Sequence, residues 1–318
     1  MSSTMHGLVF DGAPRYYDDL ARPEPGPGEA LIRVSRAGVC ATDLAIIAGY
    51  MGFSGVLGHE FVGTVETAPD PAWIGRRVVG EINAACGVCP TCRRGLPRHC
   101  PERTVLGILG RGGAFADFLT LPQENLHAIP DGVTDEQAVF VEPLAAAFRI
   151  LEQVEITSGM AVTVLGDGRL GLLIAQVLAG TGGDVRLVGR HREKLALAEG
   201  WGIAVTLGAE PPKADVVVDC TGSPDGFATA ISLTRPCGAV VLKTTCAEAP
   251  AFNPAPLVID EITVIGSRCG PFEPAVQALA EGRIDVAPMI DRVFPLRDGE
   301  AALARAGERG SLKVLLTP

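Results

Sequence analysis

The sequence predicts an α/β protein with a β-rich first part and a doubly wound parallel sheet in its second part. Residues 1–135 contain short apolar runs between Gly and Pro, which is the pattern of short strands. From residue 136 onward, strand-like and helix-like segments alternate, which is typical of a parallel sheet. A glycine motif at 166–171 lies between a buried strand and a helix, as in a dinucleotide-binding fold.

The composition excludes several classes of protein. Of the 318 residues 47% are hydrophobic and 20% are charged, so the chain can bury a large core and is not disordered. The length suggests two domains of roughly 150 residues each. The net charge of −10 argues against a nucleic acid or an anionic membrane as partner. The sequence has no apolar run of about 18 residues and no secretory signal at its start, so we expect a cytoplasmic protein.

The expected elements follow from the apolar runs and their period. In the β-rich part, strands are expected at 30–34, 61–65, 75–79 and 116–121. In the second part we expect a helix over 136–153, strands at 161–165, 185–188, 215–219, 239–243 and 262–265, and helices over 172–179 and 192–199. The tail from residue 283 is mixed, with strands at 292–296 and 313–316 around a helix over 299–306.

One connection in the second part is too short for a helix. Only about eight residues separate Thr206 from Asp215, whereas a helical crossover between parallel strands needs about ten to twelve. Two interpretations stay open. Either Val205–Leu207 is a vestigial edge strand, or the chain crosses as an extended loop.

Four of the nine cysteines have the spacing of a metal site. Cys86, Cys89, Cys92 and Cys100 follow the pattern C-x2-C-x2-C-x7-C, and short loops of this length can wrap one cation. Four thiolates favour a closed, tetrahedral and therefore structural zinc site. The alternatives are a four-cysteine iron–sulfur cluster and four unrelated buried thiols.

The glycine motif predicts a binding site for the cofactor's pyrophosphate. Its residues are Gly166, Asp167, Gly168, Arg169, Leu170 and Gly171, in the order G-x-G-x-x-G. The glycines allow a tight turn, and the helix that follows offers its N-terminus to the phosphates. A plain glycine turn is the alternative.

The end of the next strand predicts NADP(H) in preference to NAD(H). An NAD-binding fold has a carboxylate there for the ribose hydroxyls, whereas this chain has Gly189. Arg190, His191, Arg192 and Lys194 follow and can meet a 2′-phosphate. The alternative is an ordinary basic helix start. On the first interpretation, Gly189→Asp is expected to move the preference toward NAD(H).

A dispersed third set consists of residue types that bind catalytic zinc. Cys40 lies in G-V-C-A-T-D, His59 and Glu60 lie in G-H-E, and Glu142 lies in E-P-L. Asp43 has the chemistry to hold a ligand imidazole in place. Thr42 offers a hydroxyl that can pass a proton.

These motifs together resemble the zinc-dependent medium-chain alcohol dehydrogenase/reductase family over essentially the whole chain. The resemblance implies a GroES-like catalytic domain over 1–135 and 284–318 with the zinc lobe at 86–100, and a Rossmann domain over 136–283. It also implies two zinc ions per chain. Cys40, His59 and Glu60 match the first catalytic ligands, and Glu142 matches an acidic residue of polyol and threonine dehydrogenases.

Three departures from that pattern keep the substrate open. Ala45 stands where polyol and threonine dehydrogenases usually have a relay histidine, so a proton must leave through Thr42 and water or through another group. The segment between Glu60 and Cys86 is short, and the crossover helix is missing. By family position only, the pocket walls are Phe53, Leu109, Phe115 and Phe272.

We therefore expect a zinc-dependent oxidoreductase that transfers a hydride between a small alcohol or carbonyl substrate and NADP(H). The alternatives are a zinc-free reductase of alkenes or quinones on the same fold, and a non-enzymatic binding protein built on a zinc module. The apolar segment Glu261–Gly266 is expected to be an edge strand, and pairing two such edges would give a homodimer or homotetramer.

Overall fold

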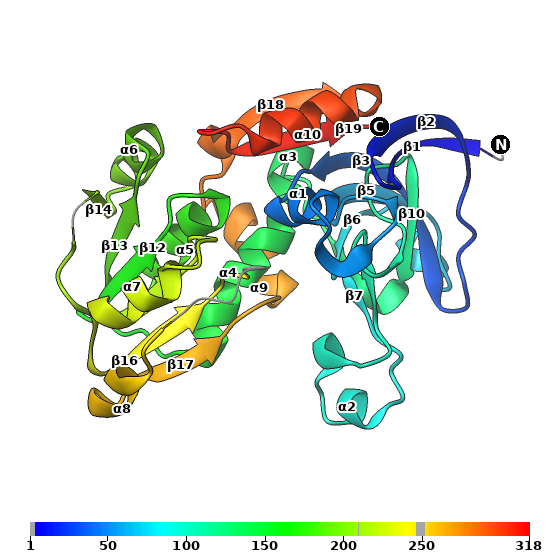
Figure 1. The fold of residues 1–318 in the computed structure, drawn as a ribbon. Coiled ribbons are helices and arrows are strands. Elements are labelled where there is room, and N and C mark those ends of the chain that lie inside the picture. The colour runs from blue at the N-terminus through cyan, green and yellow to red at the C-terminus, as the bar shows by residue number, and fades with distance from the viewer. Residues whose placement is uncertain (1–3, 209, 246–251) are drawn as a thin grey trace. The chain divides into compact units, whose positions relative to one another are not determined.

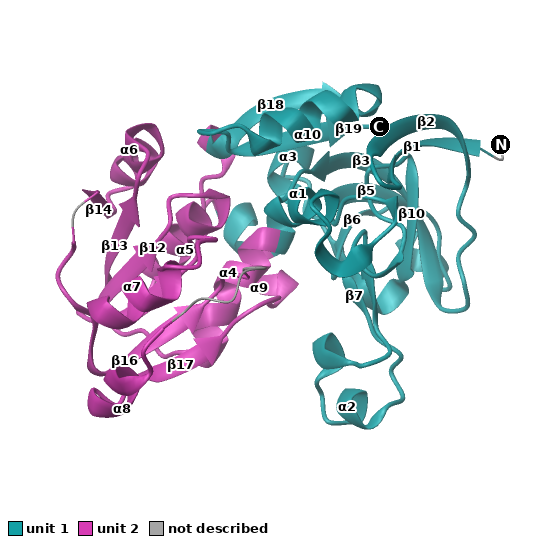
Figure 2. Ribbon diagram, in the orientation of Figure 1, with its two compact units in different colours: residues 1–142, 276–281, 289–318 teal, residues 143–275, 282–288 magenta. Residues whose placement is uncertain are grey.

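The computed structural model describes residues 4–208, 210–245 and 252–318, and the chain divides into two compact units (Figure 2). Unit 1 comprises Met1–Glu142, Val276–Glu281 and Met289–Pro318, and unit 2 comprises Pro143–Ala275 and Gly282–Pro288. The division falls inside helix α4 (Val141–Gln153) and not at residue 135, where the sequence pattern changes. The change of pattern marks the start of helical structure, whereas the division between the units falls inside α4 and, further along the chain, inside α9 (Phe272–Ala280).

The main sheet of unit 1 is organised around strand β3 (Glu29–Gly38). One edge of β3 pairs with β5 (Glu60–Thr67), and the other edge is divided between two strands. Strand β10 (Phe118–Pro122) pairs with residues 29–33 of β3, and the C-terminal strand β19 (Lys313–Thr317) pairs with Ala37 and Gly38. Beyond β5 the sheet continues through β6 (Arg77–Gly80) and β11 (Leu126–Ala128), and beyond β19 it ends at β18 (Ile290–Pro295). Figure 1 labels β3, β5, β6, β10, β18 and β19.

Unit 1 also contains two small sheets that the sequence pattern does not predict. Strands β1 (Thr4–Phe10) and β2 (Pro14–Ala21) form an antiparallel hairpin, to which β4 (Gly55–Val56) pairs. Strand β2 has no buried residue, so it lacks the apolar alternation by which a strand is recognised. The third sheet, at the base of the cysteine lobe, consists of β7 (Asn83–Ala84), β8 (Thr104–Leu106) and β9 (Gly110–Arg111).

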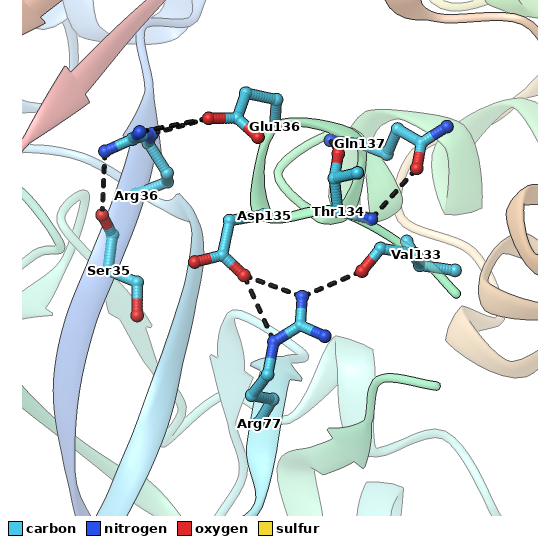
Figure 3. A network of polar contacts seen from close by, with 8 residues as sticks. All are labelled: Ser35, Arg36, Arg77, Val133, Thr134, Asp135, Glu136 and Gln137. Atoms are coloured by element: carbon cyan, nitrogen blue, oxygen red, sulfur yellow. Dashed lines mark hydrogen bonds and ion pairs between the residues drawn. The ribbon is translucent and has the colours of Figure 1, made fainter. Parts of the chain in front are cut away.

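The helix expected over 136–153 is two helices, α3 (Asp135–Ala138) and α4. Thr134 caps α3, and its hydroxyl accepts a hydrogen bond from the Gln137 amide. Two arginines of the sheet hold this short helix (Figure 3). The Arg77 guanidinium donates to Asp135 at 2.6 Å, and that of Arg36 donates to Glu136 at 3.1 Å. The remaining helices of unit 1 are α1 (Ala41–Ile47), α2 (Pro90–Arg93) and α10 (Gly299–Gly307).

Unit 2 is the predicted doubly wound domain, with a parallel sheet of strand order β14-β13-β12-β15-β16-β17. The first strand of the unit, β12 (Ala161–Leu165), is central, and four of its five residues are buried. The other strands are β13 (Asp184–Gly189), β14 (Ala204–Leu207), β15 (Ala214–Asp219), β16 (Thr234–Leu242) and β17 (Thr263–Gly266). The helices that accompany them are α5 (Arg169–Ala179), α6 (Arg192–Gly200), α7 (Gly226–Leu233), α8 (Ala255–Ile259) and α9 (Phe272–Ala280).

The short connection contains both features that the sequence left open. Strand β14 is a true edge strand, because residues 204–207 pair with residues 186–189 of β13. Between β14 and β15, the residues that the structure describes (208 and 210–213) form no helix. Across the described residues, no helix is both long enough and apolar enough to cross a bilayer.

Candidate functional site

Cys40 lies at the junction of the main sheet and helix α1. The amide of Val39 donates to the Val314 carbonyl of β19, which fixes the end of β3. Cys40 is extended and is the N-cap residue of α1. Asp43 accepts a hydrogen bond from the Cys40 amide at 2.8 Å, and this capping contact fixes the thiol at the end of the sheet. Thr42 Oγ1 is 3.8 Å from Cys40 Sγ.

Glu60 is the first residue of strand β5, and His59 directly precedes it. They follow Gly58, whose φ is +94° and whose added Cβ would lie 2.3 Å from the Phe115 ring, so only glycine fits this turn. His59 is 3% exposed and Glu60 is 1% exposed. One possible ligand atom from each of Cys40, His59 and Glu60 lies within 4.8 Å of the other two. The structure therefore brings together three of the four residues proposed from the dispersed motifs.

Asp43 also lies against the imidazole of His59. Its Oδ1 is 3.2 Å from His59 Nδ1, although the two atoms do not have hydrogen-bond geometry. Burial by itself lowers the pKa of His59, but the charges of Asp43 and Cys40 outweigh burial and raise this pKa well above its usual value. Because Nδ1 faces Asp43, the other ring nitrogen, Nε2, is the one available to a metal.

The donor set fits a zinc ion. A thiolate, an imidazole and a carboxylate are all zinc ligands. Glu60 Oε1 is buried and has no hydrogen-bond partner, which is costly for a carboxylate oxygen in a protein interior. A cation held by Cys40, His59 and Glu60 would satisfy that oxygen.

Lys313, which the sequence analysis missed, binds the other oxygen of Glu60. Its Nζ donates to Glu60 Oε2, and both side chains are 1% exposed. The ammonium also lies 5.4 Å from the ring centre of Phe140. A Cβ at Gly38 would lie 2.7 Å from Glu60 Oε2, so the glycine of the G-V-C motif leaves room for this carboxylate. The sequence feature that could have indicated Lys313 is its position as the first residue of the apolar strand Lys-Val-Leu-Leu.

Glu142 is placed differently from the other three proposed ligands. It lies half-buried in the first turn of α4, and its carboxylate is not part of the group within 4.8 Å. Of the proposed pocket walls, Phe115 packs on Gly58 next to His59. Phe53 and Phe272 are buried, whereas Leu109 is 37% exposed.

The four lobe cysteines form a second donor group, with all four sulfurs within 4.8 Å of one another. The sulfurs of Cys86 and Cys100 are 3.5 Å apart, and Cys89 is 3.5 Å from Cys92 and 3.8 Å from Cys100. These separations exclude disulfides. They agree with a tetrahedral zinc, for which Zn–S bonds of about 2.3 Å put the sulfurs roughly 3.8 Å apart. The Cys92 amide donates to Cys89 Sγ and lowers the pKa of this thiol to about 7.

In unit 2, the glycine motif joins β12 to α5 in a turn that requires its first and last glycines. Gly166 has a φ of +113°, and its Cβ would lie 2.7 Å from the Cys220 carbonyl oxygen. A Cβ at Gly171 would lie 1.8 Å from the Gly166 oxygen. Gly168 is the N-cap residue of α5, and Arg169 and Leu170 are its first residues. The N-terminus of α5 can accept a phosphate.

At the end of β13, an unexpected carboxylate lies beside Gly189. Asp167 Oδ2 accepts hydrogen bonds from the amides of Arg190 at 2.6 Å and His191 at 2.7 Å. The His191 Nδ1 atom is 3.0 Å from Asp167 Oδ1. Lys194, in the first turn of α6, is 8% exposed, and burial lowers its pKa. In the sequence, Asp167 occupies one of the variable positions of the G-x-G-x-x-G motif, which by themselves indicate no role.

Comparison with known proteins gives matches in both units. The chain matches two protein-family models, the alcohol dehydrogenase GroES-like domain over residues 26–131 and the zinc-binding dehydrogenase over residues 170–281. It is 33% identical to an L-threonine 3-dehydrogenase of Streptomyces avermitilis over 327 residues, 94% of each chain. It is 29% identical to a sorbitol dehydrogenase of Halalkalibacterium halodurans over 324 residues, 93% of this chain and 94% of that protein.

Two solved structures are similar over their whole length. A putative zinc-binding dehydrogenase from Sinorhizobium meliloti 1021 bound to NADP has a TM-score of 0.91 and 29% identity, with 100% of each chain covered. The alcohol dehydrogenase rspB from Escherichia coli CFT073, complexed with NADH, has a TM-score of 0.92 and 26% identity, again with 100% of each chain covered.

Proposed function

The chain belongs to the zinc-dependent medium-chain alcohol dehydrogenase family, and we propose that it interconverts an alcohol and its carbonyl compound with NADP(H) as the preferred cofactor. The observation that carries this proposal is the buried group of Cys40, His59 and Glu60, which supplies three zinc donors in unit 1. Glu142 is the fourth proposed ligand.

The chemistry divides between the bound groups and the chain's own residues. When bound, zinc supplies a Lewis acid that lowers the pKa of an alcohol, and the nicotinamide accepts or delivers the hydride. Asp43 orients the His59 imidazole, and Lys313 holds one oxygen of Glu60. Alcohol oxidation releases one proton as the hydride leaves carbon. Thr42 offers a hydroxyl near Cys40 to pass that proton to water, because Ala45 carries no group that could do so.

A second zinc is proposed for Cys86, Cys89, Cys92 and Cys100. The sulfur separations support one tetrahedral ion with no open position, and such a site is structural. A multi-iron cluster would hold its cysteine sulfurs further apart.

NADP(H) is proposed because of the end of β13. Gly189 brings no carboxylate of its own, Arg190 follows it directly, and Lys194 lies in the first turn of α6. One similar structure holds NADP and another holds NADH, so it is these residues, and not the comparisons, that support the preference for NADP(H). One arginine–phosphate contact contributes roughly 1.5–3 kcal/mol, which corresponds to about a tenfold to hundredfold preference.

We propose further that the protein is a homodimer or homotetramer. Strand β17 lies at the edge of the parallel sheet, and its Val264 is 38% exposed. In the neighbouring helix α8, Val258 and Ile259 are each 77% exposed. Pairing of two β17 edges about a two-fold axis would cover apolar surface that is otherwise prone to aggregation.

A turnover screen tests the proposed activity. The zinc-loaded enzyme is offered alcohols with NADP⁺, and aldehydes, ketones, imines, activated alkenes and quinones with NADPH, while absorbance at 340 nm is followed. We expect turnover in the alcohol and carbonyl panels that is lost in His59→Ala. Turnover of only activated alkenes or quinones, unchanged in His59→Ala, would support the zinc-free alternative. Binding of neither cofactor would support the non-enzymatic one.

A further inference from the structure

Asp167 occupies the space that a side chain at Gly189 would need. A Cβ at Gly189 would lie 2.3 Å from Asp167 Oδ2 and 2.6 Å from its Cγ. The end of this strand is where an NAD-binding fold has its ribose-binding carboxylate. In this chain, a carboxylate therefore reaches the same region from the glycine motif of the neighbouring strand.

The Asp167 carboxylate accepts hydrogen bonds from the protein's own backbone. Its Oδ2 accepts the amides of Arg190 and His191, which fills both lone pairs of that oxygen. An ionised carboxylate only accepts hydrogen bonds, so His191 Nδ1 must carry its proton and donate to Oδ1. Burial alone would raise the pKa of Asp167, but the hydrogen bonds from the His191 ring and the two amides lower it below its usual value.

We propose that Asp167 is a positioning residue for the 2′-phosphate of NADP(H), an inference that rests on the proposed cofactor preference. Asp167 ties the glycine motif, which receives the pyrophosphate, to the turn between β13 and α6. That turn contains Arg190 and His191, whose side chains would bind the 2′-phosphate. With both amides held, the turn is ordered before the cofactor binds, so binding costs less entropy.

A competing effect is the negative charge of Asp167 itself. An exposed carboxylate would repel a phosphate and favour NAD(H). The side chain of Asp167 is only 9% exposed, and its oxygens already receive three hydrogen bonds. The nearly buried ammonium of Lys194 adds a positive charge to the same cluster. The positioning effect should therefore exceed the repulsion.

The test compares 2′,5′-ADP with 5′-AMP, because these probes differ only in the 2′-phosphate and contain no nicotinamide. Their dissociation constants are measured by titration calorimetry for the wild type, Asp167→Ala and Asp167→Asn. The wild type should bind 2′,5′-ADP at least about tenfold more tightly than 5′-AMP. In Asp167→Ala this ratio should fall at least about fivefold. Asp167→Asn keeps a carbonyl oxygen for the two amides and should retain most of the ratio.

Asp215 provides a matched control in the same unit. Its carboxylate also accepts a backbone amide, that of Ala161 at 2.9 Å, but at the opposite end of the strands. Asp215→Asn should leave the ratio unchanged. If Asp167→Ala does not fold, Asp167→Ser replaces it, because a serine hydroxyl is too short to reach the two amides.

The outcomes separate the two proposals. A wild type that binds the two probes equally contradicts the NADP(H) preference, and the role of Asp167 fails with it. A wild-type preference that persists in Asp167→Ala and Asp167→Ser contradicts the role of Asp167 alone. A preference that rises in those variants would show that the carboxylate mainly repels the phosphate. Equal losses in Asp167→Asn and Asp167→Ala would show that charge, and not amide binding, is responsible.

Discussion

Glu60 and Lys313 are 253 positions apart in the sequence and form an ion pair in which each side chain is 1% exposed. The pair connects the proposed catalytic zinc site to the C-terminal strand β19. Its existence depends on the pairing of β19 with the end of β3, because that pairing puts Lys313 beside the start of β5. Glu60 thus has one oxygen held by the protein and one, Oε1, without a hydrogen-bond partner.

Replacing Lys313 by methionine should strongly destabilise the protein. Lys313→Met leaves the buried Glu60 carboxylate with no cation from the chain, and breaking a buried pair costs about 3–5 kcal/mol. We expect this loss in the free energy of unfolding, measured by urea denaturation of the zinc-free protein. Lys313→Arg, which keeps the charge, should lose less. Lys313→Met combined with Glu60→Gln should recover part of the loss, and a double variant no more stable than Lys313→Met would contradict this account.

Two zinc ions per chain should be found by metal analysis, and the two sites should respond differently to mutation. Cys92→Ala should lose one zinc and unfold more readily, because the binding energy of a structural metal is folding energy. His59→Ala should abolish turnover and leave the circular dichroism spectrum unchanged. Retention of both metals in Cys92→Ala would refute the lobe site.

The cofactor preference should depend on Arg190. The wild type should show a kcat/KM for NADP(H) at least about tenfold above that for NAD(H). Arg190→Ala should lose most of this preference, because one arginine–phosphate contact contributes roughly 1.5–3 kcal/mol. A wild type that prefers NAD(H) would contradict the proposal.

A switch toward NAD(H) should need two changes, which corrects the expectation from the sequence. Gly189→Asp alone forces its Cβ to within 2.3 Å of Asp167 Oδ2 and places a second carboxylate beside the first. This single variant should lose stability and bind both cofactors poorly. Gly189→Asp with Asp167→Ala frees the space, so the double variant should prefer NAD(H) in kcat/KM. If Gly189→Asp alone is stable and prefers NAD(H), the steric argument is wrong.

The chain should form an oligomer through β17. Light scattering at micromolar concentration should give at least twice the chain mass of 33.1 kDa. Val264→Lys puts a charge on the exposed strand edge and should lower that mass without changing the secondary structure. A wild-type monomer would contradict this prediction.

The sequence alone was sufficient to predict a site or an element where the interacting residues are close along the chain. Cys86 to Cys100 form one short lobe, so their spacing could predict that four sulfurs meet. The motif at 166–171 predicted the turn between β12 and α5 for the same reason. The parallel sheet followed from its alternating apolar runs, since the period of a segment depends only on its own residues.

Contacts between distant segments depend on the tertiary structure. Strand β2 is mostly polar and exposed, so only its pairing with β1 reveals it. The partner of Glu60 and the carboxylate that fills the space at Gly189 depend on which strands are neighbours. The hydrophobic pattern of a segment indicates which of its residues are buried, but it does not indicate which residues of other segments contact them. A charge such as that of Lys313 or Asp167 is stable in the interior only because the packing of other segments provides its partner.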